Sequence, residues 1–412
     1  MPASPSTARA INDRLALRLL QQEGPLTAGQ LKQLTGLSRP TVADLVERLA
    51  EAGLITVVGE AGEQRRGPNA KLYGIVADRA RLAALDVRTE GVSVVVADLV
   101  GRVLAEASVP IGGESGTGPV VEQAVALVER VVKEAEASGA PPRAGVRAWG
   151  SLHTVGIGAP GLIDPATGEL RDSSGLPAWH RRLVAALQDR FPEAHVSIDN
   201  EANLAALAEQ RDGTARDRDT FVLLWLSYGT GAAVVLDGAL RRGASGGTGE
   251  IGFLPVPGTT GLPSATDCDG GFHSLAGSAA IAELARRHGV RATVTGEEPP
   301  AAALVRSAVK SAAGERAAGG AGRFLDDLAD RLAVGVASVV AILDPGCVVL
   351  GGEVGQAGGQ ELAARVQKRV RRMSPLVTEV RPSALGGGAV LRGALLTARD
   401  RAQDELFAPA ER

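Results

Sequence analysis

Five basic and hydroxyl residues near the N-terminus have the types and the spacing to contact duplex DNA. Ser38, Arg39 and Thr41 open the segment SRPTVADLVERLAEAG, and Arg65 and Arg66 lie in the segment EAGEQRRGPNA. An arginine can donate two hydrogen bonds to a guanine edge, whereas hydroxyls and further arginines can bind phosphate. This region is therefore predicted to recognise nucleic acid, with Arg39 at the bases and Arg65 and Arg66 on a phosphate track or in a minor groove. Thr27 and Arg48 are expected to contact DNA as well.

Three short helices are predicted to position these side chains. The first is expected over residues 12–22, the second follows the cap Thr27 and stops at Gly36, and the third follows the cap Ser38. Apolar residues of the third helix recur at the i, i+3, i+4, i+7 spacing of a buried face, which leaves Thr41 and Arg48 exposed. The leucines expected to face inward on the first two helices are Leu15, Leu19, Leu20, Leu31 and Leu34.

Two strands are expected after the third helix, over residues 54–58 and 71–75, with the basic loop between them as a wing. The order of helix, turn, capped helix and wing is typical of a winged helix-turn-helix that binds DNA. The alternative is a small helical module that binds other proteins.

Composition limits the remaining possibilities. A chain of 412 residues is too long for one ordinary core, and 45% hydrophobic with 22% charged residues is typical of a globular protein. The first 80 residues are slightly basic, although the net charge is −3. Two cysteines are too few for a disulfide framework, and the sequence shows neither an 18-residue apolar run nor a secretory signal. These features predict a cytoplasmic protein that does not associate with membranes.

From Arg81 onward, short β-branched runs alternate with helical segments. Such alternation favours an α/β fold in which helices pack on sheets. Strands are expected over 82–86, 92–99, 102–109, 155–157, 196–199, 221–227 and 347–350, and helices over 120–137, 183–190, 201–210 and 324–343.

The order and spacing of motifs resemble the ROK family (repressors, open reading frames, kinases) over nearly the whole chain. The matching segments are GLSRPTVADLVERLAEAGL, Gly158–Gly161 with Asp164 and Gly168, DNEAN at 199–203, GTG at 229–231, GEIG at 249–252 and DPGCVVLGG at 344–352. The resemblance implies a winged helix-turn-helix over residues 1–80 and a two-lobed, actin-like (ribonuclease H-like) sugar-kinase fold over 81–412. Lobe I is expected over about 81–205 with the C-terminal helix 393–406, and lobe II over about 206–392.

The motif that would bind nucleotide phosphates departs from the family pattern. The resemblance implies Asp-x-Gly-x-Thr, but the chain reads DVRTE at 86–90, with Arg88 in place of the glycine and Glu90 in place of the threonine. Phosphates need close backbone N–H groups, which a bulky side chain and an added negative charge oppose. ATP is therefore not expected as a cofactor.

The catalytic and zinc positions depart as well. Glu201 stands where the kinases of the family have a catalytic Asp, and a carboxylate displaced by about 1 Å can cost on the order of 100-fold in rate. Glu201 could alternatively only stabilise the start of the helix that follows it. At the zinc position Phe253 replaces a histidine, and at most Cys268 and His273 remain of four ligands. A closed zinc site needs four donors, so neither zinc nor another metal is expected.

The polar residues that remain for an effector, once the resemblance is applied, are few. Two carboxylates and an amide can still bind hydroxyls, whereas Phe253 and Leu275 would make the pocket more apolar. The residues expected to bind the effector are Gly161, Asp164, Asn200, Glu201 and Glu250.

Together these features predict a DNA-binding regulator that is not an enzyme. Its partners are expected to be a double-stranded DNA operator, a small-molecule effector of the sugar type, and further copies of the chain in a homodimer or tetramer. Paired heads would read half-sites about one helical turn apart, and repression is the expected outcome. The alternatives are a catalytically weak sugar kinase and a ligand-free regulator that a partner protein controls.

Overall fold

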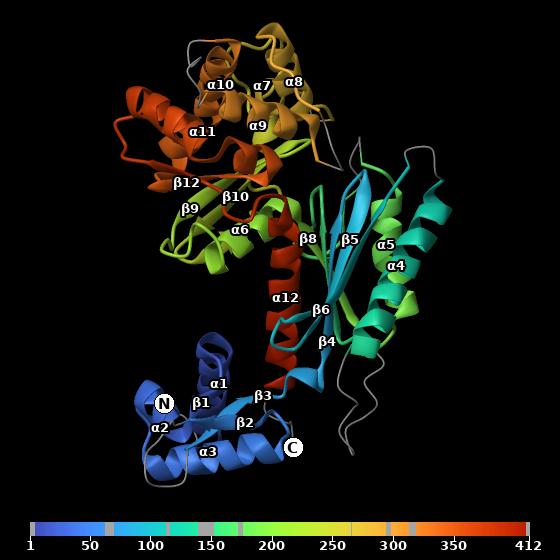
Figure 1. Ribbon diagram of the computed structural model, residues 1–412, viewed down its shortest axis with the longest axis vertical. Helices are drawn as coiled ribbons and strands as arrows, with labels where there is room; N and C mark the ends of the chain where they lie inside the picture. The colour runs from blue at the N-terminus through green and yellow to red at the C-terminus, as the bar shows by residue number, and fades with distance from the viewer. Residues whose placement is uncertain are drawn as a thin grey trace.

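The computed structural model describes residues 5–61, 70–112, 116–138, 152–171, 176–264, 266–293, 298–312 and 319–408. They form a head and two lobes, with the head (blue) at one end of the molecule (Figure 1). A single long helix, α12 (Ala389–Leu406, red), runs from the junction of the lobes along lobe I to the head. Among the described helices, none is both long and apolar enough to span a bilayer.

The head is the expected winged helix-turn-helix. Thr27 caps the second helix through a capping box with Gln30, and Gly36 ends that helix in the left-handed conformation, with φ of 70°. This turn needs glycine because side chains with a Cβ rarely adopt that conformation. The elements are α1 (Pro5–Glu23), β1 (Leu26–Thr27), α2 (Ala28–Thr35), α3 (Arg39–Glu51), β2 (Ile55–Ala61) and β3 (Ala70–Ile75), with strand order β1-β3-β2.

Two of the leucines predicted to face inward do not. Leu15 is 39% exposed and Leu34 is 49% exposed. Helix α1 begins at Pro5, earlier than expected; it buries Leu20 as predicted, and Leu17 in place of Leu15. Positions three apart share a helical face, whereas Leu15 lies about 200° around the helix from Leu17, so both could not face the same core. The prediction for Leu15 and Leu34 was wrong because spacing does not fix which face of a short helix meets the core.

Lobe I is built on a five-stranded sheet of order β6-β5-β4-β7-β8. Strands β4, β5 and β6 are antiparallel neighbours, while β4, β7 and β8 run parallel. Helices α4 and α5 pack on one face of this sheet and α12 packs on the other. The elements are η1 (Ala77–Arg79), β4 (Arg81–Val87), β5 (Gly91–Asp98), β6 (Val103–Pro110), α4 (Thr117–Ser138), β7 (Thr154–Ala159), α5 (Trp179–Arg190) and β8 (His195–Asn200).

Lobe II repeats the same arrangement with the order β11-β10-β9-β12-β13. Two equivalent sheets, each with helices on both faces, confirm the expected two-lobed sugar-kinase fold. The elements are α6 (Glu201–Arg211), β9 (Phe221–Leu226), β10 (Thr230–Leu236), β11 (Ala239–Arg241), η2 (Ile251–Phe253), α7 (His273–Ala276), α8 (Ser278–Arg287), α9 (Pro300–Ala312), α10 (Gly320–Leu343), β12 (Cys347–Gly351), α11 (Gly352–Met373), β13 (Glu379–Pro382) and η3 (Gly386–Gly388).

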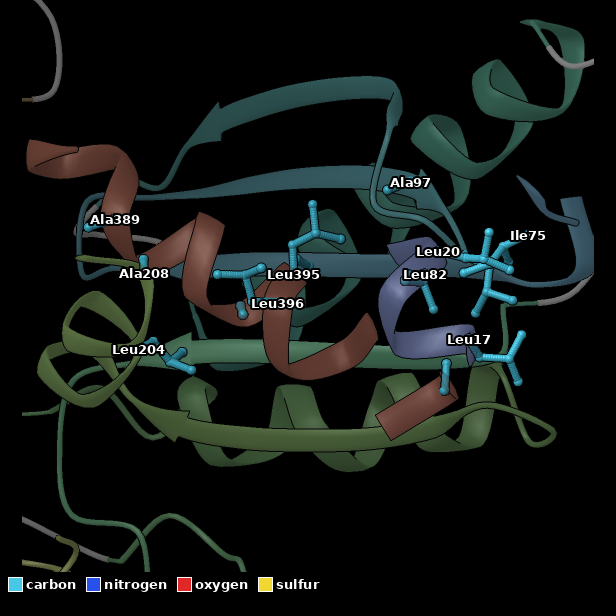
Figure 2. Packing of buried hydrophobic residues seen from close by; sticks show 14 of the residues in the cluster. Leu17, Leu20, Ile75, Leu82, Ala97, Leu204, Ala208, Ala389, Leu395 and Leu396 are labelled. Atoms are coloured by element: carbon cyan, nitrogen blue, oxygen red, sulfur yellow. The ribbon is translucent and has the colours of Figure 1, made fainter. Parts of the chain in front are cut away.

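Helices α6 and α12 cross at the junction between the lobes, and a glycine permits the crossing. A Cβ on Gly393 would lie 2.0 Å from the carbonyl oxygen of Leu204, a distance that no side chain can adopt. The apolar cluster around this crossing extends along α12 to Leu17 and Leu20 of the head, as Figure 2 shows. One apolar cluster therefore joins the head to the junction of the lobes, whereas two further clusters lie within lobe II and lobe I.

Candidate functional site

The N-terminus of α3 presents polar side chains to solvent. Ser38 caps the helix: its Oγ accepts a hydrogen bond from the backbone N–H of Thr41 at 3.3 Å and lies 2.7 Å from Thr41 Oγ1. Ser38, Arg39 and Thr41 are all exposed. Within the described part of the chain Arg39 makes no ion pair, so its five donors are available for a nucleic-acid base or phosphate.

Two of the other predicted DNA contacts, Thr27 and Arg48, bind partners within the head. Thr27 is used by the capping box of α2. Arg48 forms an ion pair with Asp13 of α1 at 2.5 Å and a second with Asp44 on its own helix. These bonds orient Arg48 along the surface of the head and join α3 to α1. Arg65 and Arg66 lie outside the described residues.

Asn200 and Gly161 form the first part of the site between the lobes. Asn200 caps α6: its Oδ1 accepts hydrogen bonds from the backbone N–H groups of Ala202 and Asn203 at 2.8 and 3.4 Å. Its Nδ2 donates to the carbonyl oxygen of Gly161 at 2.9 Å. Asn200 therefore fixes the loop after β7 against the start of α6.

Two of the predicted effector residues lie apart from that contact. Asp164 accepts hydrogen bonds from the backbone of Ala166 and from Arg171, both at 2.8 Å, and these bonds close a surface turn. Glu250 is exposed and precedes the short helix η2. Among the described residues, no hydrogen bond joins Asp164 or Glu250 to Asn200 or Glu201.

A buried charged cluster lies where the turn between β4 and β5 meets lobe II. Arg88 donates from Nε and Nη2 to Asp86 Oδ2 at 3.0 and 2.8 Å, from Nη1 to Glu353 Oε1, and from Nη2 to the carbonyl oxygen of Gly387 at 3.0 Å. Asp86 is 6% exposed and Glu353 is 8% exposed. The guanidinium thus occupies the turn that the resemblance assigned to nucleotide phosphates, and it faces carboxylates of both lobes.

Glu201 belongs to the same cluster. Burial raises the pKa of Glu201 to about 8, and the carboxylates of Asp86 and Glu353 add to the rise although Arg88 opposes it. A general base must be deprotonated before it can accept a proton, and a carboxyl with such a pKa is mostly protonated at neutral pH. Glu201 is therefore suited to donate a hydrogen bond rather than to act as a base.

The remnant of the zinc motif lies in lobe II near η2. His273 Nδ1 is 3.5 Å from Thr230 Oγ1, and burial raises the pKa of the Cys268 thiol. Leu275 is buried and Phe253 is 38% exposed. Within the described residues no group of three or more His, Cys, Asp or Glu side chains has the geometry to hold a metal ion. The expectation of a metal-free protein stays a prediction.

The sequence analysis missed the partners of Arg88 and a second ion pair between the lobes. Asp199 of β8 is 9% exposed and binds Arg242, which follows β11, at 2.5 Å. Arg88 and Glu353 are separated by 265 positions, so no local pattern indicates that they meet. The only signal was an arginine where a glycine was expected.

Comparison with known proteins accounts for both parts of the chain. The ROK family profile matches residues 95–401, and the MarR family profile matches residues 11–67. A putative xylose repressor from Caldicellulosiruptor sp. (strain Rt8B.4) is 25% identical over 373 residues, which cover 88% of each chain. The DNA-binding transcriptional dual regulator NagC from Escherichia coli (strain K12) is 24% identical over 406 residues, 94% of each chain.

Solved structures agree with this fold. A ROK family transcriptional regulator, homologous to the E. coli MLC protein, superimposes with a TM-score of 0.72 at 21% identity and covers 97% of this chain and 98% of its own. A ROK hexokinase from Thermus thermophilus superimposes with a TM-score of 0.58 at 28% identity and covers 79% of this chain and 99% of its own. Since the family profile spans most of the sequence, the chain belongs to the ROK family.

Proposed function

We propose that this chain is a sequence-specific DNA-binding transcriptional regulator, acting as a repressor, whose operator affinity responds to a sugar-like metabolite bound between the lobes. The observation that carries the proposal is a winged helix-turn-helix, with Arg39 free at the exposed start of α3, attached to a ROK sugar-kinase fold. Relatives that match nearly end to end are named as repressors or transcriptional regulators.

The start of α3 is the proposed reading edge. Arg39 would contact base edges while Ser38 and Thr41 bind phosphate, because the N-terminus of a helix favours anions. Arg65 and Arg66 are proposed for the wing contact. Arg48 and Thr27 are better suited to hold the head together, since their polar atoms are already bound within it.

Helix α12 offers a physical route from the junction of the lobes to the head. Its first residues follow Gly387, whose carbonyl oxygen binds Arg88. Near its other end, Gln403 Nε2 donates to Gln21 Oε1 of α1 at 2.8 Å and to the carbonyl oxygen of Leu99 at 2.9 Å. Arg14 of α1 also pairs with Asp404 at 3.1 Å.

The polar contacts between α12 and α1 are accompanied by apolar packing. Leu17 and Leu20 of α1 lie beside Ile75 and Leu82 in the apolar cluster that also contains residues of α12 (Figure 2). A displacement of α12 by lobe movement would therefore displace α1 as well. In a homodimer or tetramer, which we propose as the working form, that shift would change the spacing of paired heads and release the operator.

We propose further that the cleft performs no phosphoryl transfer and needs neither ATP nor zinc. Arg88 fills the turn between β4 and β5, and Glu201 holds its proton at neutral pH. Kinase activity is the competing candidate, favoured by the likeness to a ROK hexokinase. Incubating the protein with Mg²⁺-ATP and a sugar panel separates the two: a phosphorylated sugar would support the kinase, and its absence is the result that we expect.

The proposal is tested by measuring the affinity of the full chain for genomic promoter fragments and for random duplex DNA, with and without xylose or N-acetylglucosamine. We expect a preferred fragment whose affinity falls when an effector is added. A preferred fragment that no metabolite affects would favour control by a partner protein. No preference for any fragment at low ionic strength would contradict DNA recognition itself.

A further inference from the structure

Arg88, in the turn between β4 and β5, donates hydrogen bonds across the junction of the lobes. Arg88 belongs to lobe I, as does Asp86, which holds the Nε edge of the guanidinium. Glu353, in the first turn of α11, and Gly387, in η3, belong to the lobe II side. One planar group therefore binds both lobes at once, in a geometry that suits the fork of donors on arginine.

We propose that Arg88 is a built-in tether that holds the two lobes closed in the absence of any ligand, and that ligand control of the cleft works by breaking or replacing this tether. The inference rests on the proposed function, which it extends to the mechanism of regulation. Opening the junction would separate Arg88 from Glu353 and Gly387 while leaving Asp86 bound, because Asp86 lies on the same strand pair.

Burial makes this contact different from a surface ion pair. The side chains of Asp86, Arg88 and Glu353 are 8%, 22% and 10% exposed, so salt screens their attraction far less than that of exposed charges. By contrast, Arg242 in the second pair between the lobes is 47% exposed. The Arg88 contacts are thus less exposed to solvent than the Asp199–Arg242 pair.

Two carboxylate oxygens of the cluster lack hydrogen-bond partners among the described residues, so a ligand could compete with Arg88 for these carboxylates. Asp86 Oδ1 and Glu353 Oε2 are buried without a hydrogen-bond partner in the described structure. All three nitrogens of Arg88 are already engaged, and Glu201 brings a third carboxyl to the single cation. A ligand that donates hydrogen bonds, such as a polyol, could bind these free oxygens and take over Glu353 from Arg88.

The tether is tested by measuring the distance between the lobes with spin labels on Lys133→Cys of α4 and Arg287→Cys of α8. Both positions are exposed, and a Cys268→Ser background leaves only the buried Cys347 as a native thiol. Pulsed dipolar spectroscopy on the full chain then compares Arg88→Met with the parent. Arg102→Met is the matched control because it removes an ion pair, with Asp98, that lies wholly within lobe I.

We expect one narrow distance distribution for the parent and for Arg102→Met, and a broader distribution with a second population several Å away for Arg88→Met. If Arg88→Met fails to fold, Glu353→Gln, which weakens only the arm on lobe II, should broaden the distribution to a smaller extent. Identical distributions in the parent and in a folded variant would overturn the tether. DNA binding is not measured here, so operator recognition could stand while the tether fails, or the reverse.

Discussion

The two lobes share one strand order but differ at the turn that follows their first strand. In lobe I this turn contains Arg88, which is half-buried and binds acids of both lobes. In lobe II the equivalent turn, between β9 and β10, contains Gly229, where a Cβ would meet no atom within 4 Å. The same place in the same architecture is thus filled in one lobe and open in the other. Fold alone does not decide chemistry; the residues at such turns do.

The comparison is tested most strongly by removing the filling residue. Arg88→Met should lower the free energy of unfolding by about 3–5 kcal/mol, because it leaves Asp86 and Glu353 buried without a cation. Gly229→Ala in the open turn should change it by less than about 0.5 kcal/mol, as expected for a surface substitution. Urea unfolding of both variants measures the difference. A loss below about 1 kcal/mol for Arg88→Met would show that the turn in lobe I is not filled as described.

Glycines at the crossing of α6 and α12 extend the contrast between filled and open positions. Gly393→Ala should destabilise the protein by about 1–3 kcal/mol, since the new methyl group would overlap the carbonyl oxygen of Leu204. The matched control is Gly388→Ala, because a Cβ on Gly388 would meet no atom within 4 Å. Thermal unfolding should separate the two variants, and equal melting temperatures would contradict the tight crossing.

The acid cluster beside the filled turn should make stability depend on pH. The pKa of Glu201 is raised from its ordinary value of 4.5 to about 8 in the folded protein. As the pH rises, the unfolded chain therefore releases this proton at a lower pH than the folded protein does. Folding stability contributed by the protonated carboxyl should therefore fall between about pH 5 and pH 8, by up to about 3–4 kcal/mol.

Glu201→Gln removes that titration, so the variant should lose less stability than the parent over this pH range. Glu169→Gln, which changes an exposed carboxylate, provides the control. Parallel pH profiles for the parent and Glu201→Gln would show that Glu201 titrates normally.

In the head, Arg48 forms ion pairs whereas Arg39 forms none in the described residues. Apart from the control variants, Arg48→Ala has the smallest expected change in stability. Arg48→Ala should cost about 0.5–1 kcal/mol because it removes the pairs with Asp13 and Asp44, which are partly exposed. It should leave the base preference of DNA binding unchanged. A loss of preference as large as that of Arg39→Ala would return Arg48 to the DNA interface.

The sequence predicted the head because its signals are local. Thr27, Gly36 and Ser38 mark helix ends through caps and turns within a few residues, and the spacing from Val42 to Leu49 marks one buried face. Leu15 and Leu34 could not be placed in this way, because the side of a short helix that meets the core is decided by distant elements.

The contacts at the junction of the lobes were predictable only in outline. The resemblance indicated which motifs meet there, and Asn200 does bind Gly161. It could not show that Arg88 binds Gly387, which is 299 positions away, or that Asp164 is used by a surface turn. Long-range partners depend on how two sheets pack, and no spacing rule in the sequence describes that packing.

The claim on which the function depends is that α3 reads DNA through Arg39. Binding of the parent and of Arg39→Ala should be measured against the preferred promoter fragment and against random duplex of equal length at a fixed salt concentration. The account predicts a clear preference in the parent and a loss of about 1–3 kcal/mol of that preference in Arg39→Ala, with similar binding to random duplex. A parent protein that binds both duplexes equally would contradict it.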